Sequence, residues 1–260
     1  MPMILTRFGT QNLPQTAGVS SIGTGSTVPV AQPVVGGSYD AWATGIAPVD
    51  FPYDAPYSFI LTASTAATLL ATYHDLTALL GQKLALTRKN LSDGVESWCW
   101  ARLTQVPTVN AAGQLLSQPL RMLFQVWSDW YGEHHQQDDT VANGANPITL
   151  TNAGNKPAHN PLIFTITSGN GEVRSVTITN ATTGHSFMWS GRLYTSKSLV
   201  INIGNESVMN DGVDAYDEFT RPSDKAQWMA LGAGGNSLSV TLVDTGTGSV
   251  LRSDFYDTWM

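Results

Sequence analysis

The sequence predicts a mainly β protein with a single long helix, on three observations. Charged residues make up only 13% of the chain, about half the share of an average soluble protein. Most apolar runs are short and are separated by residues that form turns, as in antiparallel sheets. One segment alone has the apolar period of a long α-helix. The length of 260 residues accommodates either two modest domains or one large one.

Charge and cysteine content exclude several classes of protein. The net charge is −7, from 13 basic and 20 acidic residues. The chain therefore lacks the excess of positive charge with which proteins bind the phosphate backbone of nucleic acids. Cys99 is the lone cysteine, which excludes an intrachain disulfide and a cysteine-based zinc cage. Residues 1–5 are too short for a signal peptide, and no run reaches the ~20 apolar residues of a membrane span. We therefore expect a chain without the usual export signal and without membrane insertion.

The N-terminal segment has no charged residue from Phe8 to Tyr39 and is rich in Gly, Ser, Thr and Pro. This composition predicts an extended arm over residues 1–33. The prolines that continue to Pro56 discourage a helix. The first domain is expected over residues 34–135, with its first strand near residues 58–61.

A helix is predicted over residues 65–80. Four large side chains with helical spacing form its apolar stripe: Leu69, Tyr73, Leu76 and Leu80. Ser64 stands where an N-cap residue is expected, and Gly81 can end the helix at the C′ position.

Strands follow the predicted helix. Residues 83–88 and 98–106 flank the turn signal Asp93-Gly94, which predicts a hairpin. Alternation of apolar and polar residues predicts another strand over 120–127.

The stretch from Gly132 to Pro147 is polar and rich in Gly and Asn, which predicts a linker over residues 136–159. The second domain is expected over residues 160–260. Its short apolar runs predict an antiparallel β-sandwich. The expected strands cover residues 162–167, 175–179, 187–189, 199–203, 207–209 and 237–243.

Common catalytic signatures are missing from the sequence. It contains no G-x-S-x-G elbow, no phosphate-binding G-x-x-x-x-G-K-[ST] loop and no H-E-x-x-H pair. We therefore expect no enzyme activity, no catalytic residue and no cofactor-binding residue. Paired carboxylates of a glycosidase stay an open alternative, because two suitably spaced acids can occur among any 20.

Two segments rich in acidic residues or histidines are candidate metal sites. The first consists of His134, His135, Asp138 and Asp139. Imidazole and carboxylate suit several divalent ions, but a solvated linker explains this segment better. The second consists of Asp211, Asp214, Asp217 and Glu218. Its spacing departs from a calcium loop, and the Asn210-Asp211-Gly212 turn signal explains it. No metal ligand is therefore assigned.

Binding of sugars is a further alternative, since the chain has eight tryptophans. Trp98 and Trp100 lie two apart and share one strand face, which we interpret as core or subunit packing. Asn90, Asn180 and Asn205 match the N-x-[ST] pattern, but without a secretory signal we attribute the matches to chance.

Several segments resemble the distal tail proteins of long-tailed, siphovirus-type bacteriophages. In the C-terminal half the resemblance rests on four segments: GNKPAHNPLIFTI (154–166), VTITNATTGHSFMWSG (176–191), LVINIGNESVMNDGVDAY (199–216) and WMALGAGGNSLSVT (228–241). In the N-terminal half it rests more loosely on three: VVGGSYDAWATG (34–45), LTALLGQKLALTR (76–88) and DGVESWCWARL (93–103). The order of the segments carries the likeness, which spans about residues 30–243. The uncharged arm and residues 244–260 depart from the family.

The resemblance implies a structural role without enzymatic activity or cofactor. Six copies would close into a ring at the distal end of the tail tube. The N-terminal domain would be a tube-like barrel or sandwich with a flanking helix, and the C-terminal domain a galectin-like sandwich. Partners would be the tail tube protein and the baseplate hub or receptor-binding proteins, with DNA passing through unbound. The protein would lie in the virion tail tip, and in the host cytoplasm during assembly. The alternative is a carbohydrate-binding module of a host-recognition apparatus.

Overall fold

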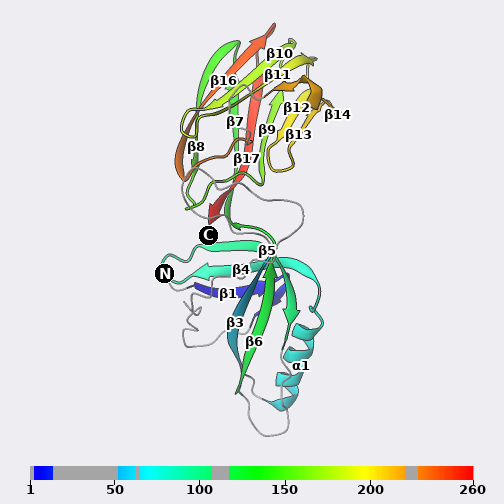
Figure 1. Cartoon of the computed structure of the whole chain (residues 1–260), viewed down its shortest axis with the longest axis vertical. Helices are drawn as coiled ribbons and strands as arrows, with labels where there is room; N and C mark the ends of the chain where they lie inside the picture. Colours follow the sequence, from blue (N-terminus) through cyan, green and yellow to red (C-terminus); the bar gives the residue numbers. More distant parts are fainter. Residues whose placement is uncertain (1–2, 14–51, 63–64, 107–116, 221–227, 260) are drawn as a thin grey trace. The chain divides into compact units, whose positions relative to one another are not determined.

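The computed structural model of the protein describes residues 3–13, 52–62, 65–106, 117–220 and 228–259. The chain divides into two compact units, Met1–Trp130 (unit 1) and Tyr131–Met260 (unit 2). Their named strands pair in antiparallel sheets, and unit 1 carries the helix (Figure 1). The predicted mainly β class with one long helix is confirmed. Residues 14–33 of the expected arm lie outside the described residues, as does Ser64.

Unit 1 contains a sheet with the strand order β2-β1-β4-β5-β6-β3. The strands are β1 (Met3–Phe8), β2 (Gln11–Asn12), β3 (Tyr53–Thr62), β4 (Lys83–Asn90), β5 (Glu96–Gln105) and β6 (Ser117–Val126). β1 corrects the expectation that the extended arm begins at residue 1. It pairs with β4 and buries Leu5 and Phe8, which are enough apolar surface to hold it in the sheet.

The sheet of unit 1 is strongly curved. β4 and β5 separate β1 from β6 along the sheet, yet Phe8 of β1 and Phe124 of β6 have ring centroids only 5.2 Å apart. The curvature therefore brings inner side chains of non-adjacent strands together in one core. The inner face of β5 contributes Cys99, Ala101 and Leu103, all fully buried.

Helix α1 (Ala66–Thr77) runs beside β6 and β3 in Figure 1. Its N-cap is Thr65, whose hydroxyl accepts a hydrogen bond from the Thr68 amide, instead of the predicted Ser64. Leu69 and Leu76 are buried as the stripe predicts. Leu80 lies beyond the end of the helix and is 42% exposed, because the helix ends one turn earlier than expected. Within the described residues, no helix is both long and apolar enough to cross a membrane.

Unit 2 is a sandwich of two antiparallel sheets. One has the order β14-β13-β12-β9-β17-β7 within this unit, and the other β15-β11-β10-β16-β8. The first sheet comprises β7 (Trp130–Val141), β9 (Leu162–Thr167), β12 (Ser198–Asn202), β13 (Ser207–Asn210), β14 (Val213–Asp214) and β17 (Ser249–Trp259). The second comprises β8 (Gly144–Asn152), β10 (Val173–Asn180), β11 (His185–Leu193), β15 (Phe219–Thr220) and β16 (Gly234–Asp244). A short 3-10 turn, η1 (Tyr216–Glu218), precedes β15.

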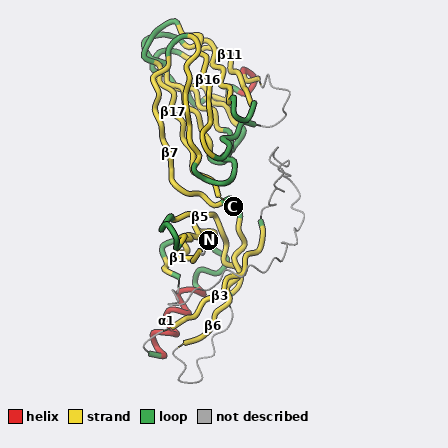
Figure 2. Tube along the Cα trace, turned by 90° about the vertical axis from the view of Figure 1, so that its left-hand side faces the viewer, coloured by secondary structure: helices red, strands yellow, loops and turns green. Residues whose placement is uncertain are grey.

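The core of unit 2 lies between the two sheets. Phe164 of β9 faces Phe187 of β11, with ring centroids 6.1 Å apart. Both belong to a continuous buried cluster drawn from the two sheets. Figures 1 and 2 show that the long strands run along the unit and that loops gather at its two ends.

The expected linker over residues 136–159 is wrong. β7 and β8 occupy most of that stretch, and β8 pairs along its length with β16. The division between the units lies earlier, after Trp130. The polar composition of β7 is typical of a linker, but its side chains pack against polar and aromatic residues of β17 and not against an apolar core.

Candidate functional site

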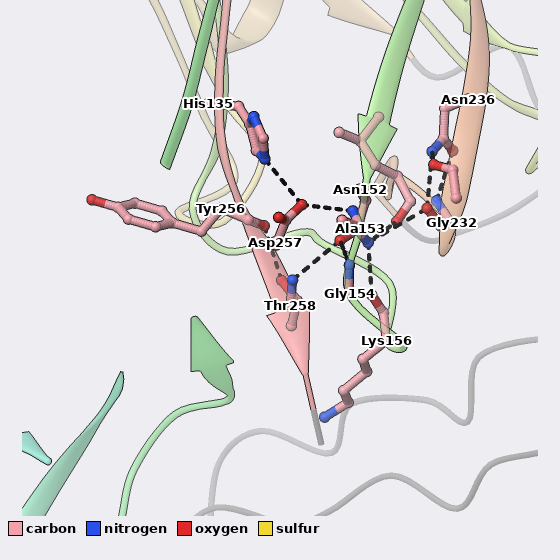
Figure 3. Close-up of polar contacts among 12 residues, drawn as sticks. His135, Asn152, Ala153, Gly154, Lys156, Gly232, Asn236, Tyr256, Asp257 and Thr258 are labelled. Atoms are coloured by element: carbon pink, nitrogen blue, oxygen red, sulfur yellow. Dashed lines mark hydrogen bonds and ion pairs between the residues drawn. The ribbon is translucent and has the colours of Figure 1, made fainter. Parts of the chain in front are cut away.

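A polar cluster occupies one end of unit 2, where β7 and β17 lie side by side (Figure 3). Its members include His135 of β7, Asp257 of β17 and the loop after β8 that starts at Ala153. The side chain of Asp257 is only 6% exposed, and its Oδ1 accepts a 2.7 Å hydrogen bond from the Ala153 amide. This hydrogen bond fixes the orientation of the Asp257 carboxylate.

His134 and His135 point to opposite faces of β7, as successive residues of a strand must. The His134 ring stacks on Tyr256, with centroids 4.6 Å apart, and its Nε2 lies 2.6 Å from Asp254. The His135 ring stacks on the buried Phe255, with centroids 5.0 Å apart. Each histidine thus has its own aromatic neighbour and its own carboxylate on β17.

Glu133 lies two residues before His135 and shares its face of β7. Together with Asp257 these residues form a set in which one ligand atom from each lies within 4.8 Å of the others. His135 Nε2 is 3.1 Å from Asp257 Oδ1, but the geometry does not make a hydrogen bond. Glu133, His135 and Asp257 are the described residues that could jointly hold a metal ion.

Asn152 holds the backbone around the cluster in place. Its buried carboxamide oxygen accepts hydrogen bonds from the amides of Gly154 and Thr258, at 3.0 and 3.1 Å. Its nitrogen donates to the Lys156 carbonyl at 2.8 Å. One side chain thereby joins the end of β8 to the end of β17 and positions the residues beside Asp257.

The four candidate ligands of the first segment, His134, His135, Asp138 and Asp139, do not meet at one site among the described residues. Asp138 pairs instead with Arg252, whose Nε and Nη2 donate to the two carboxylate oxygens at 2.7 and 2.8 Å. These hydrogen bonds hold the pKa of the Asp138 carboxyl below its ordinary value. Asp139 accepts hydrogen bonds from Gln137. Asp257 has no local signal in the sequence, because it lies more than a hundred residues from His135 in a strand that was not predicted.

The second acidic segment is explained by a turn and by individual partners. Asp211 and Gly212 have φ values of 49° and 80° between the paired residues Asn210 and Val213, as a type I′ hairpin turn requires. The Asp211 carboxylate lies 2.9 Å from the Lys197 ammonium. Glu218 accepts a 2.9 Å hydrogen bond from the Trp189 indole.

Unit 1 has an exposed surface of aromatic and basic side chains, which we call the tryptophan surface: Trp98, Trp100, Trp127, Lys83 and Arg102. Trp98 and Trp100 share the outer face of β5, as predicted, with ring centroids 5.5 Å apart. Trp100 is 42% exposed, so core packing does not account for it. Lys83 and Arg102 lie over the Trp127 ring at 5.3 and 5.6 Å from its centroid.

The core of unit 1 also contains ionisable groups. Cys99 is fully buried, and burial raises the pKa of its thiol well above the usual range. Burial likewise raises the pKa of Tyr53 to about 12. The Arg88 guanidinium lies 4.1 Å from the Trp130 ring centroid and donates to Ser97 at 2.9 Å. The lone cysteine of the chain is therefore buried and largely protonated, so it is not exposed as a thiolate nucleophile.

No protein-family model matches the chain, and no curated protein matches it by sequence. The fold of the chain is similar to a solved structure, that of SPP1 Dit, which is described as a paradigm of the hub adsorption apparatus in phages that infect Gram-positive bacteria. The likeness has a TM-score of 0.57 at 12% identity and covers 96% of this chain and 98% of that chain. The activated phage p2 baseplate with Sr matches at a TM-score of 0.38 and 9% identity, over 98% of this chain and 90% of that chain. The first likeness shows that the chain has the fold of SPP1 Dit, and the second adds nothing to that conclusion.

Proposed function

We propose that this protein is a structural component of a bacteriophage tail tip. One observation carries the proposal: the fold of SPP1 Dit extends over nearly the whole of both chains, through both units. A likeness confined to one sandwich would be weak support, because sandwiches serve many functions. A likeness that covers two different units is more specific, and it agrees with the family resemblance of the sequence.

In this role, six copies form a ring that joins the tail tube to the baseplate or receptor-binding apparatus. The tryptophan surface supports self-association, because aromatic side chains exposed on a sheet face are enriched at protein interfaces. Trp100 and Trp127 are 42% and 36% exposed in the single chain. A second copy that covered them would remove this apolar area from water.

DNA passes through the proposed ring without specific binding. The net charge of −7 supports this, because phosphate contacts need Lys and Arg, and only 13 are present per chain. We expect the channel face to be poor in both. The proposed partners are the tail tube protein on one side and hub or receptor-binding proteins on the other.

The alternative, a carbohydrate-binding module, has less support. Sugar binding by stacking needs an accessible aromatic face. The tryptophans Trp189 and Trp228 of unit 2 are buried, at 0% and 7% exposure, so stacking on the sandwich would have to use exposed tyrosines such as Tyr194 and Tyr216. Screening the full chain against immobilised glycans separates this alternative from the structural role.

The ring is tested by light scattering after size-exclusion chromatography of the full chain. We expect a species of six subunit masses that negative-stain images show as a closed ring, since a repeated heterologous interface closes on itself. A monomer at high protein concentration, together with the absence of a ring in purified virions, would overturn the proposed assembly.

A further inference from the structure

Three potential metal ligands meet at the polar end of unit 2. They are Glu133 and His135 of β7 and Asp257 of β17. We propose that they form a binding site for a divalent transition-metal ion of the Zn²⁺ class. The proposal concerns unit 2 alone and is independent of the tail-tip function.

The geometry is close to that of a bound ion. Two ligand atoms at about 2.1 Å from a common tetrahedral ion lie about 3.4 Å from each other. The His135 Nε2 and Asp257 Oδ1 atoms are already 3.1 Å apart, and the Glu133 ligand atom completes a set within 4.8 Å. Glu133 is exposed, so rotation of its side chain can close the remaining distance without disturbing the core.

The ligand atom of His135 needs a partner that the protein does not supply. Its Nε2 is shielded from solvent and makes no hydrogen bond, despite the short distance to Asp257. A buried polar atom without a partner destabilises the folded chain. A metal ion between the imidazole and the carboxylate satisfies both groups, because each offers a lone pair to it.

The surroundings hold two of the ligands in position, as at established metal sites. The Ala153 amide donates to Asp257 and fixes the carboxylate, while stacking on Phe255 orients the His135 ring. The backbone that carries the Ala153 amide is held in turn by Asn152 (Figure 3).

The donor set selects the class of ion. One imidazole nitrogen with two carboxylates suits Zn²⁺ and its neighbours in the transition series. Ca²⁺ prefers six to eight oxygen ligands, which three side chains including an imidazole do not provide. Three protein ligands leave a position for water, so the site resembles an open one more than a closed structural cage. The bound ion would tie the start of β7 to the end of β17.

The adjacent histidine provides a matched control. His134 is the next residue of β7 and also lies beside a carboxylate of β17, at 2.6 Å from Asp254. It belongs to the opposite face and has no third ligand residue near it among the described residues. His134→Gln therefore removes one imidazole from the same strand without touching the proposed site.

The test is metal binding by the full-length chain after chelator treatment and dialysis. Isothermal titration with Zn²⁺ measures affinity and stoichiometry, and Co²⁺ gives a visible spectrum that reports nitrogen and oxygen coordination. We expect one ion per chain, a rise in melting temperature on adding Zn²⁺, and the same results for His134→Gln. Glu133→Gln should weaken binding about tenfold or more, and His135→Gln about a hundredfold.

Several results would overturn the proposal. These are no binding of Zn²⁺ or Co²⁺ by the folded chain, binding that His134→Gln weakens as much as His135→Gln, and wild-type affinity in both site variants. Glu133→Gln keeps the test decisive even if His135→Gln fails to fold, because Glu133 is exposed and its substitution removes no buried side chain.

Discussion

Phe8 of β1 and Phe124 of β6 pack edge to face, with ring centroids 5.2 Å apart and an interplanar angle of 71°. Both rings are fully buried, although more than a hundred residues separate them along the chain. The contact shows that the N-terminal strand is part of the core of unit 1 and not an appendage.

Phe8→Ala should destabilise unit 1 by about 3–5 kcal/mol, the usual cost of removing a buried phenylalanine. Leu70→Ala is the control, because Leu70 is large, apolar and 40% exposed on α1. Denaturant-dependent hydrogen exchange at the amides of β4, the strand paired with β1, measures the change. Equal effects of the two substitutions would mean that β1 contributes little to the core.

Gly154→Ala should destabilise unit 2, because a methyl group there would collide with the backbone carbonyl of Thr258. The loop or β17 would have to move, and the hydrogen bonds that Asn152 makes to both would weaken. Gly235→Ala is the matched control, since nothing lies within 4 Å of the added methyl. Thermal unfolding should show a loss of about 2 kcal/mol or more for Gly154→Ala alone. Similar melting temperatures for the two variants would contradict the close approach of Gly154 to the backbone of Thr258.

Cys99 should react very slowly with iodoacetamide in the folded protein. The thiolate is the reactive form, and burial raises the thiol pKa, so the thiolate fraction at pH 8 is far below that of an exposed cysteine. The rate should rise to that of a free thiol in denaturant. Mass spectrometry follows the modification, and rapid labelling without denaturant would show that the core of unit 1 is open.

Trp100→Ser should weaken self-association of the full chain while leaving the fold of unit 1 intact, because the side chain is on the outer face of β5. Tyr194→Ser is the control, a 54% exposed aromatic residue in unit 2. Light scattering at decreasing protein concentration compares the two. If both variants assemble as the wild type does, the tryptophan surface is not a subunit contact.

Much of the fold could be predicted where apolar residues alternate. The strand over residues 162–167 has the bounds of β9, because Leu162, Phe164 and Ile166 mark one face and all three are buried. The Asp211-Gly212 hairpin followed from its turn residues, since positive φ values at both positions favour this pair.

Polar strands were not predictable in the same way. β7 carries histidines, glutamines and acids on both faces, and aromatic rings and carboxylates of β17 take the place of apolar neighbours. β17 was missed in turn, because buried Ser253 and Asp257 interrupt its apolar alternation. The cluster around Asp257 depends on both strands, so no local pattern could have indicated it.

The central claim is tested most directly by locating the protein in phage particles. Antibodies against the purified full chain, carrying gold and viewed by electron microscopy on purified virions, should label the end of the tail distal to the head. Label along the tube, on the head, or nowhere on particles that contain the protein by mass spectrometry would contradict the proposed tail-tip role.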